Sequence, residues 1–243
     1  ERAYHHLMAE ILDNSVDEAV AGHATRISVE MLADGSVKVM DNGRGIPVDP
    51  HPKYKDKSAL EVIMTTLHSG GKFSGKNYAT SGGLHGVGIS VVNALSETLT
   101  VEVARDKTLW TQSFSRGLTA SKLTKVGSAP NRRGTSVQFK PDEEIFGNKH
   151  SFKPATLFKM ARSKAYLFSG VEIRWKTALE DGETPKEATF KFPGGLADYL
   201  NETLGGSTTY SDSPFAGTVD FKEKFNVPGK VEWAINWTPA RDG

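Results

Sequence analysis

Three polar residues near the start of the chain are spaced so that their side chains could act together. Glu10, Asn14 and Asp17 fall on one face of a helix expected over residues 3–20, with Glu18 at the margin of that face. A carboxylate and an amide one helical turn apart can share a water molecule and a metal ion. A solvated helix face is the ordinary alternative, and it is the favoured one for the carboxylates taken alone.

A second candidate group is a carboxylate at the end of an expected strand. Asp41 follows Val39 by two residues and Val37 by four, so strand alternation places all three on one apolar face. A buried carboxylate needs hydrogen-bond donors. Asp41 could accept a bond from an amine of a ligand, or it could cap the glycine turn that follows. The spacing does not decide between the two.

A glycine-rich run directly before an apolar helix is the third candidate. Residues 81–88 read Ser-Gly-Gly-Leu-His-Gly-Val-Gly, and a helix is expected over residues 89–95. Glycines before a helix free several backbone N–H groups to point at one spot, where the helix dipole adds positive potential. We therefore favour an anion such as phosphate over a tight packing turn. The polar stretch 69–88 is long for a connection, which indicates a lid.

Several other kinds of chemistry are excluded or disfavoured. The 243 residues include no cysteine, so there is no disulfide, thiolate metal site or cysteine nucleophile. Residues 70–76 approach a P-loop, but Asn77 replaces the required Ser or Thr and a helix precedes where a strand is needed. Lys and Arg total 30 against 29 Asp and Glu. The basic clusters 53–57 and 131–133 therefore read as solvated loops, with a weak case for DNA contact. No apolar run approaches the roughly 20 residues of a membrane helix.

The elements expected around these groups form an irregular mixture. Ser15 falls on the apolar face of the first helix. The order lacks the regular strand–helix alternation of a doubly wound fold, so we predict an α+β fold with mostly antiparallel pairing. The expected strands cover residues 25–32, 37–41, 99–105, 108–116, 135–140, 171–177 and 230–237, and the expected helices cover residues 3–20, 58–68, 89–95, 153–168 and 196–204.

Three segments taken in order resemble a known family. They run from Glu10 to Ala19 (Glu-Ile-Leu-Asp-Asn-Ser-Val-Asp-Glu-Ala), from Asp41 to Pro47 (Asp-Asn-Gly-Arg-Gly-Ile-Pro) and from Ser81 to Ser90 (Ser-Gly-Gly-Leu-His-Gly-Val-Gly-Ile-Ser). They resemble the ATPase domain of bacterial type II DNA topoisomerases, the B subunits of topoisomerase IV and DNA gyrase. The wider GHKL group includes Hsp90, MutL and histidine kinases. The resemblance covers nearly the whole chain.

The residues at particular positions indicate which branch of this group the chain resembles most. The run from Leu84 to Gly88 and the lid sequence from Leu67 to Phe73 resemble the topoisomerases rather than the chaperones or kinases. Residues 14–18 and 88–90 lean toward topoisomerase IV rather than gyrase. A DNA gyrase B subunit is the first alternative, and a nucleotide-switched clamp of the Hsp90 or MutL kind is the second. A histidine kinase is a third.

The resemblance implies a GHKL (Bergerat) ATPase sandwich. In that fold a mostly antiparallel sheet carries helices on one face, and ATP lies between the helices and the lid. It further implies an ATPase domain over residues 1–208 and a truncated start of a transducer domain over residues 209–243. Because the sequence begins at Glu1 without Met, we expect a fragment of a longer protein.

The resemblance also implies roles for individual residues. Glu10 would be the general base that orients water toward the γ-phosphate, and Asn14 would hold Mg²⁺. Asp41 would accept the adenine amine, while Gly45 and Thr135 would fix the waters beside it. Ile46 and Pro47 would wall the base, next to the ion pair of Arg44 and Glu18 and to Asp17 on the same helix. Lys72 and Tyr78 would reach the nucleotide from the lid, and Arg105 would lie at the pocket mouth, where aminocoumarin inhibitors bind. The phosphates would be wrapped by Gly83, Leu84, His85, Gly86, Val87, Gly88 and Ile89.

The implied function is ATP binding and hydrolysis that gates DNA strand passage. In the full protein, ATP would join two such domains into a homodimer that captures duplex DNA, and a topoisomerase A subunit would cleave it. We expect a bacterial cytoplasmic, nucleoid-associated protein without a membrane partner. The family's N-terminal arm and its transducer lysine are missing from this stretch, so we expect a monomer that hydrolyses ATP weakly.

Overall fold

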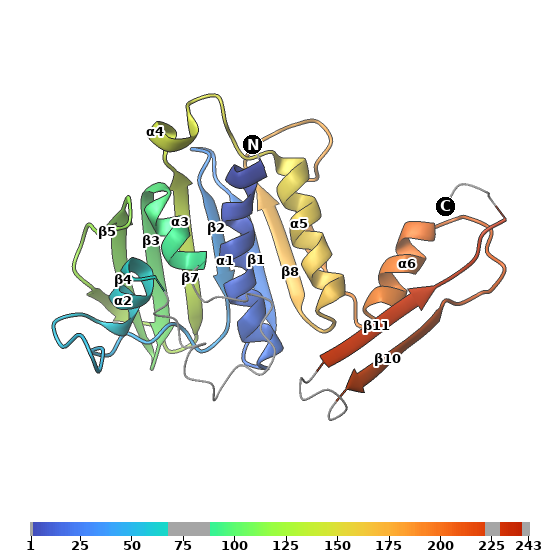
Figure 1. Ribbon diagram of the computed structural model, residues 1–243, viewed down its shortest axis with the longest axis horizontal. Helices are drawn as coiled ribbons and strands as arrows, with labels where there is room; N and C mark the ends of the chain where they lie inside the picture. The colour runs from blue at the N-terminus through green and yellow to red at the C-terminus, as the bar shows by residue number, and fades with distance from the viewer. Residues whose placement is uncertain (1, 68–87, 222–228, 240–243) are drawn as a thin grey trace.

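The computed structural model describes residues 2–67, 88–221 and 229–239. It arranges them as a sheet backed by helices, followed by a smaller hairpin (Figure 1). In chain order the described elements are α1 (Arg2–Val20), β1 (Arg26–Met31), β2 (Val37–Asp41), α2 (Ala59–Thr65), α3 (Gly88–Ala94), β3 (Ser96–Arg105), β4 (Thr108–Ser115), β5 (Leu118–Thr119), β6 (Thr124–Ser128), β7 (Gly134–Pro141), α4 (Glu143–Phe146), α5 (Pro154–Leu167), β8 (Glu172–Thr177), β9 (Glu187–Phe190), α6 (Leu196–Leu204), β10 (Phe215–Phe221) and β11 (Gly229–Ile235).

One large sheet organises the molecule. Its strands follow the order β5-β4-β3-β7-β2-β1-β8-β9, and β6 pairs with β4. The pairing is antiparallel except between β1 and β8, which run parallel with Ile27 opposite Ile173. The sheet brings the end of β2 next to the start of β7, where Met40 lies opposite Ser136. The expectation of an α+β fold with a mostly antiparallel sheet is confirmed.

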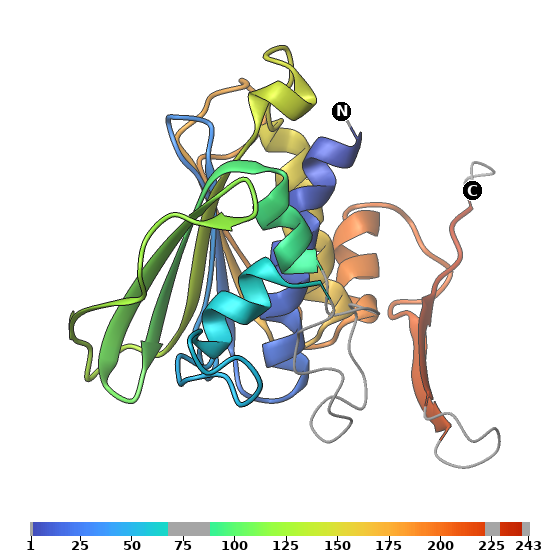
Figure 2. The same ribbon diagram turned by 60° about the vertical axis from the view of Figure 1, so that its left-hand side comes forward.

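Helices cover one face of this sheet. Figure 2 shows α1, α2, α3 and α5 on the same side, with the other face of the strands bare. Strand alternation explains the asymmetry: in β1 the side chains of Ile27, Val29 and Met31 are buried, and those between them are partly exposed. Helix α1 packs Met8, Leu12 and other apolar side chains into this core.

The hairpin of β10 and β11 forms a separate two-stranded sheet. It contacts α6, which in turn stacks on α5 through the rings of Tyr166 and Tyr199, 3.7 Å apart. The domain boundary expected between residues 208 and 209 falls in the segment between α6 and β10, and that division stays a prediction. Among the described residues, no helix combines the length and apolar character needed to cross a membrane.

Most elements start and end within a few residues of their expected positions, but five elements were not anticipated. Four of these, α4, β5, β6 and β9, have two to five residues, too few for a periodic pattern to stand out. The fifth, β10, contains Gly217, which weakens a strand signal. Glycine is needed at position 217 because a Cβ there would collide with the ring of Trp233 on β11.

The core packing of α1 leads to a first prediction. Leu12 is fully buried against the sheet, so Leu12→Ala removes buried methyl groups and leaves a cavity. We expect the free energy of unfolding, measured by urea denaturation, to fall by about 2–5 kcal/mol. The control is Leu118→Ala, because the Leu118 side chain is 73% exposed. This substitution should change the free energy of unfolding by less than about 0.5 kcal/mol. Equal effects of the two substitutions would contradict this packing.

Candidate functional site

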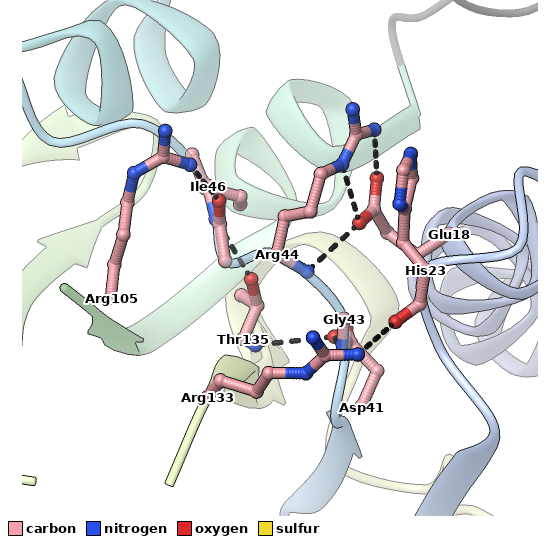
Figure 3. Close-up of polar contacts among 10 residues, drawn as sticks. Glu18, His23, Asp41, Gly43, Arg44, Ile46, Arg105, Arg133 and Thr135 are labelled. Atoms are coloured by element: carbon pink, nitrogen blue, oxygen red, sulfur yellow. Dashed lines mark hydrogen bonds and ion pairs between the residues drawn. The ribbon is translucent and has the colours of Figure 1, made fainter. Parts of the chain in front are cut away.

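Asp41, the last residue of β2, is held by donors from three separate parts of the chain. Its Oδ1 accepts bonds from the backbone N–H groups of Gly43 at 2.8 Å and Thr135 at 3.3 Å. Its Oδ2 accepts a bond from the Ser15 hydroxyl of α1 at 3.1 Å. Figure 3 shows this carboxylate between the turn and β7. The capping role that the sequence left open is therefore present, and it leaves room for a ligand role as well.

The surroundings of Asp41 change its proton affinity. Burial raises the pKa of its carboxyl group from 3.8 to about 6, against the opposing effect of the bonds from Gly43, Thr135 and Ser15. The nearby Glu18 carboxylate contributes a smaller effect in the same direction as burial. The group is therefore largely ionised above pH 7, and it then offers a desolvated negative acceptor.

The turn after β2 fits closely around this carboxylate. A Cβ at Gly43 would lie 2.8 Å from Oε2 of Glu18 and 2.9 Å from Oδ1 of Asp41. Gly45 has a φ of +79°, and its carbonyl oxygen accepts a bond from Nη1 of Arg105 at 2.9 Å. The next residue, Ile46, donates its N–H to the Thr135 hydroxyl at 3.1 Å. The turn is thus tied to β3 and β7 by side chains.

The ion pair expected between Arg44 and Glu18 is present. The Arg44 side chain donates to the two Glu18 oxygens at 2.7 Å and 3.2 Å, and its backbone N–H donates to Oε2 at 3.1 Å. This pair links α1 to the turn beside Asp41 (Figure 3). The neighbouring Pro47 is exposed, and Ile46 is partly buried.

Glu10 and Asn14 occupy the middle of the same helix. The Glu10 side chain packs against Gly88, the first residue of α3, where an added Cβ would collide with the carboxylate. Nε2 of His6 lies 3.1 Å from Oε1 of Glu10. The amide nitrogen of Asn14 donates to the Glu10 carbonyl oxygen at 2.8 Å, which directs the amide oxygen away from that carbonyl. The first helix therefore meets the end of the glycine run, next to Ile89.

The alternative of a solvated helix face is wrong for one of the three polar residues. Asp17 is only 4% exposed. Helix α1 contacts α3 and α5 in addition to the sheet, so it is not a helix with one face left entirely to solvent. Glu10 and Asn14 are partly buried on the same face.

Part of the expected site falls outside the described residues. This applies to Lys72, Tyr78 and the run Gly83–Val87. No group of three or more His, Asp or Glu side chains suited to a metal ion occurs within residues 2–67, 88–221 and 229–239.

Two contributors were missed by sequence reasoning. Ser15 is a polar residue within the apolar stripe of α1, and that position was the available signal for its bond to Asp41. Arg133 is exposed, as expected for a solvated basic loop, but it also donates to the backbone carbonyl oxygens of Asn42, next to Asp41, and of His23. The sequence carried no signal for this arrangement.

Comparisons with known proteins agree with this geometry. A family model described as histidine kinase-, DNA gyrase B- and HSP90-like ATPase matches residues 1–145. The chain is 58% identical over 242 residues to the B subunit of DNA topoisomerase 4 from Caulobacter vibrioides, covering 98% of this chain and 34% of that protein. It is 44% identical over 235 residues to the corresponding topoisomerase 4 protein from Salmonella typhimurium, covering 96% of this chain and 36% of that protein. The chain thus spans about a third of the length of these relatives.

A solved structure is also similar. It is the 43K ATPase domain of Thermus thermophilus gyrase B in complex with an aminocoumarin, with a TM-score of 0.76 and 43% sequence identity. The match covers 91% of this chain and 54% of that one.

The raised pKa of Asp41 leads to a prediction about stability and pH. The native carboxyl group binds its proton more tightly than the unfolded one, so protonation stabilises the fold as the pH falls from about 7 to 4. We expect the wild type to gain on the order of 1–3 kcal/mol over that range relative to Asp41→Asn, in urea denaturation at several pH values.

The control for this prediction is Asp106→Asn, because the Asp106 side chain is 91% exposed. Its stability difference from the wild type should change little with pH. A pH-independent difference between the wild type and Asp41→Asn would show that Asp41 titrates normally.

Proposed function

The chain belongs to the family of histidine kinase-, DNA gyrase B- and HSP90-like ATPases, and we propose that it binds and hydrolyses ATP as the N-terminal part of a topoisomerase IV B subunit. The observation that carries the proposal is the arrangement along α1. Ser15 and Glu18 hold the turn around Asp41. Asn14 directly precedes Ser15 on this helix, and Glu10 lies one to two turns earlier, beside Gly88. A nucleotide laid along this helix would have its base at Asp41 and its phosphates at Glu10.

The adenine end of the proposed site depends on Asp41. An ionised carboxylate accepts the exocyclic amine of adenine, and guanine offers a carbonyl oxygen at the corresponding position. Oδ1 of Asp41 already accepts two bonds from the protein, but Oδ2 accepts only the Ser15 bond among the described residues. Oδ2 therefore keeps a lone pair for a ligand or a water. Ile46 and Pro47 would wall the base, Thr135 and Gly45 would hold water beside it, and Arg105 would stand at the mouth.

The phosphate end depends on Asn14, Glu10 and the glycine run. Asn14 would hold Mg²⁺ through its amide oxygen together with phosphate oxygens, which fits the preference of this ion for oxygen ligands and for substrate phosphates. The ion would neutralise phosphate charge. Residues 83–89 would wrap the phosphates, and Lys72 and Tyr78 would reach the nucleotide from the lid. Asp17 would lie near the metal, on the same helix face as Asn14.

Hydrolysis in this proposal relies on positioning and charge neutralisation, as is usual for phosphoryl transfer. The Glu10 carboxylate would accept a proton from, or align, the water that attacks the γ-phosphate. Its contact with Gly88 at the start of α3 supports this role, because it sets the carboxylate beside the segment expected to bind phosphate.

The activity of the whole protein is also part of the proposal. ATP would join two copies through these domains and gate the passage of duplex DNA, with a topoisomerase A subunit as partner, at the nucleoid in the bacterial cytoplasm. The topoisomerase 4 relatives, 44% to 58% identical, support this reading. The 43% identical gyrase B domain keeps a gyrase B subunit as the alternative. Decatenation and supercoiling assays of the full-length protein with each type of A subunit would decide between them.

Asp41→Asn tests the adenine end. The substituted amide presents a donor to the adenine amine, so the two repel. We expect the binding of ADP to this chain, measured by calorimetry, to weaken by about 1–3 kcal/mol, so that the Kd rises roughly 5- to 150-fold. The matched control is Asp34→Asn in the turn between β1 and β2, which should bind ADP normally. An unchanged Kd for Asp41→Asn would show that the adenine base does not bind at this carboxylate.

Glu10→Gln tests the phosphate end. The amide keeps the size of the side chain but cannot accept the proton, so ADP binding should persist. Turnover of the full-length protein should fall by about 10²- to 10⁴-fold, the usual contribution of a general base. Glu102→Gln, a carboxylate of β3 that pairs with Arg132, is the control and should keep its turnover. Retained hydrolysis in Glu10→Gln would assign the base elsewhere.

A further inference from the structure

Arg133, at the edge of the candidate site, bonds to the backbone of two other loops. Its Nε donates to the carbonyl oxygen of Asn42 at 2.8 Å, and its Nη2 donates to that of His23 at 2.6 Å. Figure 3 shows the guanidinium reaching across the turn beside Asp41 toward His23. A forked, planar cation suits this arrangement, because it can serve two acceptors in fixed directions.

The two carbonyl groups belong to segments that are themselves joined. The side-chain oxygen of Asn42 accepts bonds from the N–H groups of Thr25 at 2.8 Å and Arg26 at 2.9 Å, and its amide nitrogen donates to the Thr25 hydroxyl. His23 lies in the same connection between α1 and β1. Arg133 therefore bonds to a unit made of the end of α1, the start of β1 and the turn after β2.

The residues that follow Arg133 form part of the base site. Gly134 has a φ of +110°, and its Cα lies so close to the Asp41 backbone that a Cβ would collide with the carbonyl oxygen. Thr135 then donates its N–H to Asp41 at 3.3 Å and accepts the Ile46 N–H on its hydroxyl. Gly134 has no side chain, so Arg133 adds two bonds to this approach, besides the Thr135 contacts and the pairing of β2 with β7.

We propose that Arg133 is a positioning residue for the nucleotide base. By clamping the start of β7 onto the turn after β2, it fixes Thr135 and Asp41 at the separation that receives adenine. The inference rests on the proposed function, since it assumes that the base binds at Asp41. The adjacent Arg132 makes a different contact, because it pairs with Glu102 on β3 at 2.9 Å.

Loosening the clamp should affect binding more than chemistry. Contacts to the base are the same before and during hydrolysis, so their loss raises KM and leaves kcat nearly unchanged. For Arg133→Ala we expect the Kd for ADP and the KM for ATP to rise about 3- to 10-fold. A looser base site should also discriminate less between ATP and GTP, and a purely structural role would not change that ratio.

The test compares Arg133→Ala, Arg133→Lys and Arg132→Ala. ADP affinity is measured on this chain, and KM and kcat for ATP and GTP are measured on the full-length protein with its A subunit. Arg133→Lys keeps one charged donor without the fork, so it should fall between the wild type and Arg133→Ala. Arg132→Ala should match the wild type in all these values. Arg133→Lys carries the same comparison if Arg133→Ala fails to fold.

Three results would overturn the inference: an unchanged KM and ATP/GTP ratio in both Arg133 variants, an equal effect of Arg132→Ala, or a fall in kcat at constant KM. Asp41→Asn separates this failure from failure of the proposed function. If Asp41→Asn weakens ADP binding and the Arg133 variants do not, only the clamp is wrong. If all of them bind ADP normally, the base does not bind at Asp41.

Discussion

The carboxylate of Asp41 is the group on which the arrangement of the site depends. Removing it from water is unfavourable, as its raised pKa of about 6 indicates. Donors from α1, from the turn after β2 and from β7 offset part of that penalty. Those donors must approach closely, which explains why glycine occupies positions 43 and 134. A Cβ at Gly43 would crowd Oδ1 of Asp41 and Oε2 of Glu18, and a Cβ at Gly134 would collide with the Asp41 carbonyl oxygen.

Helix α1 connects this carboxylate to the other half of the proposed site. It is packed on the sheet through one face, and α3 and α5 lie against it as well. Ser15 and Glu18 reach the turn around Asp41, while Glu10 meets α3 at Gly88. A helix fixed on several sides can hold both ends of a nucleotide at a constant distance. That rigidity suits a reaction that depends on positioning.

The sequence predicted the long elements and the fold class, because alternation and helical periodicity report burial directly. It also placed Glu10 and Asn14 on one face of α1. It missed the bonds of Ser15 and Arg133, which join residues 26 to 110 positions apart in the chain. The partners in such bonds depend on strand register and loop packing, which no local pattern records. The burial of Asp17 was missed as well.

The most direct test of the account is a crystal structure of this chain with a non-hydrolysable ATP analogue and Mg²⁺. We expect the adenine amine within hydrogen-bonding distance of the Asp41 carboxylate, and the triphosphate running along α1 toward Asn14 and Glu10. A nucleotide bound elsewhere on the molecule, or bound here with its base away from Asp41, would contradict it.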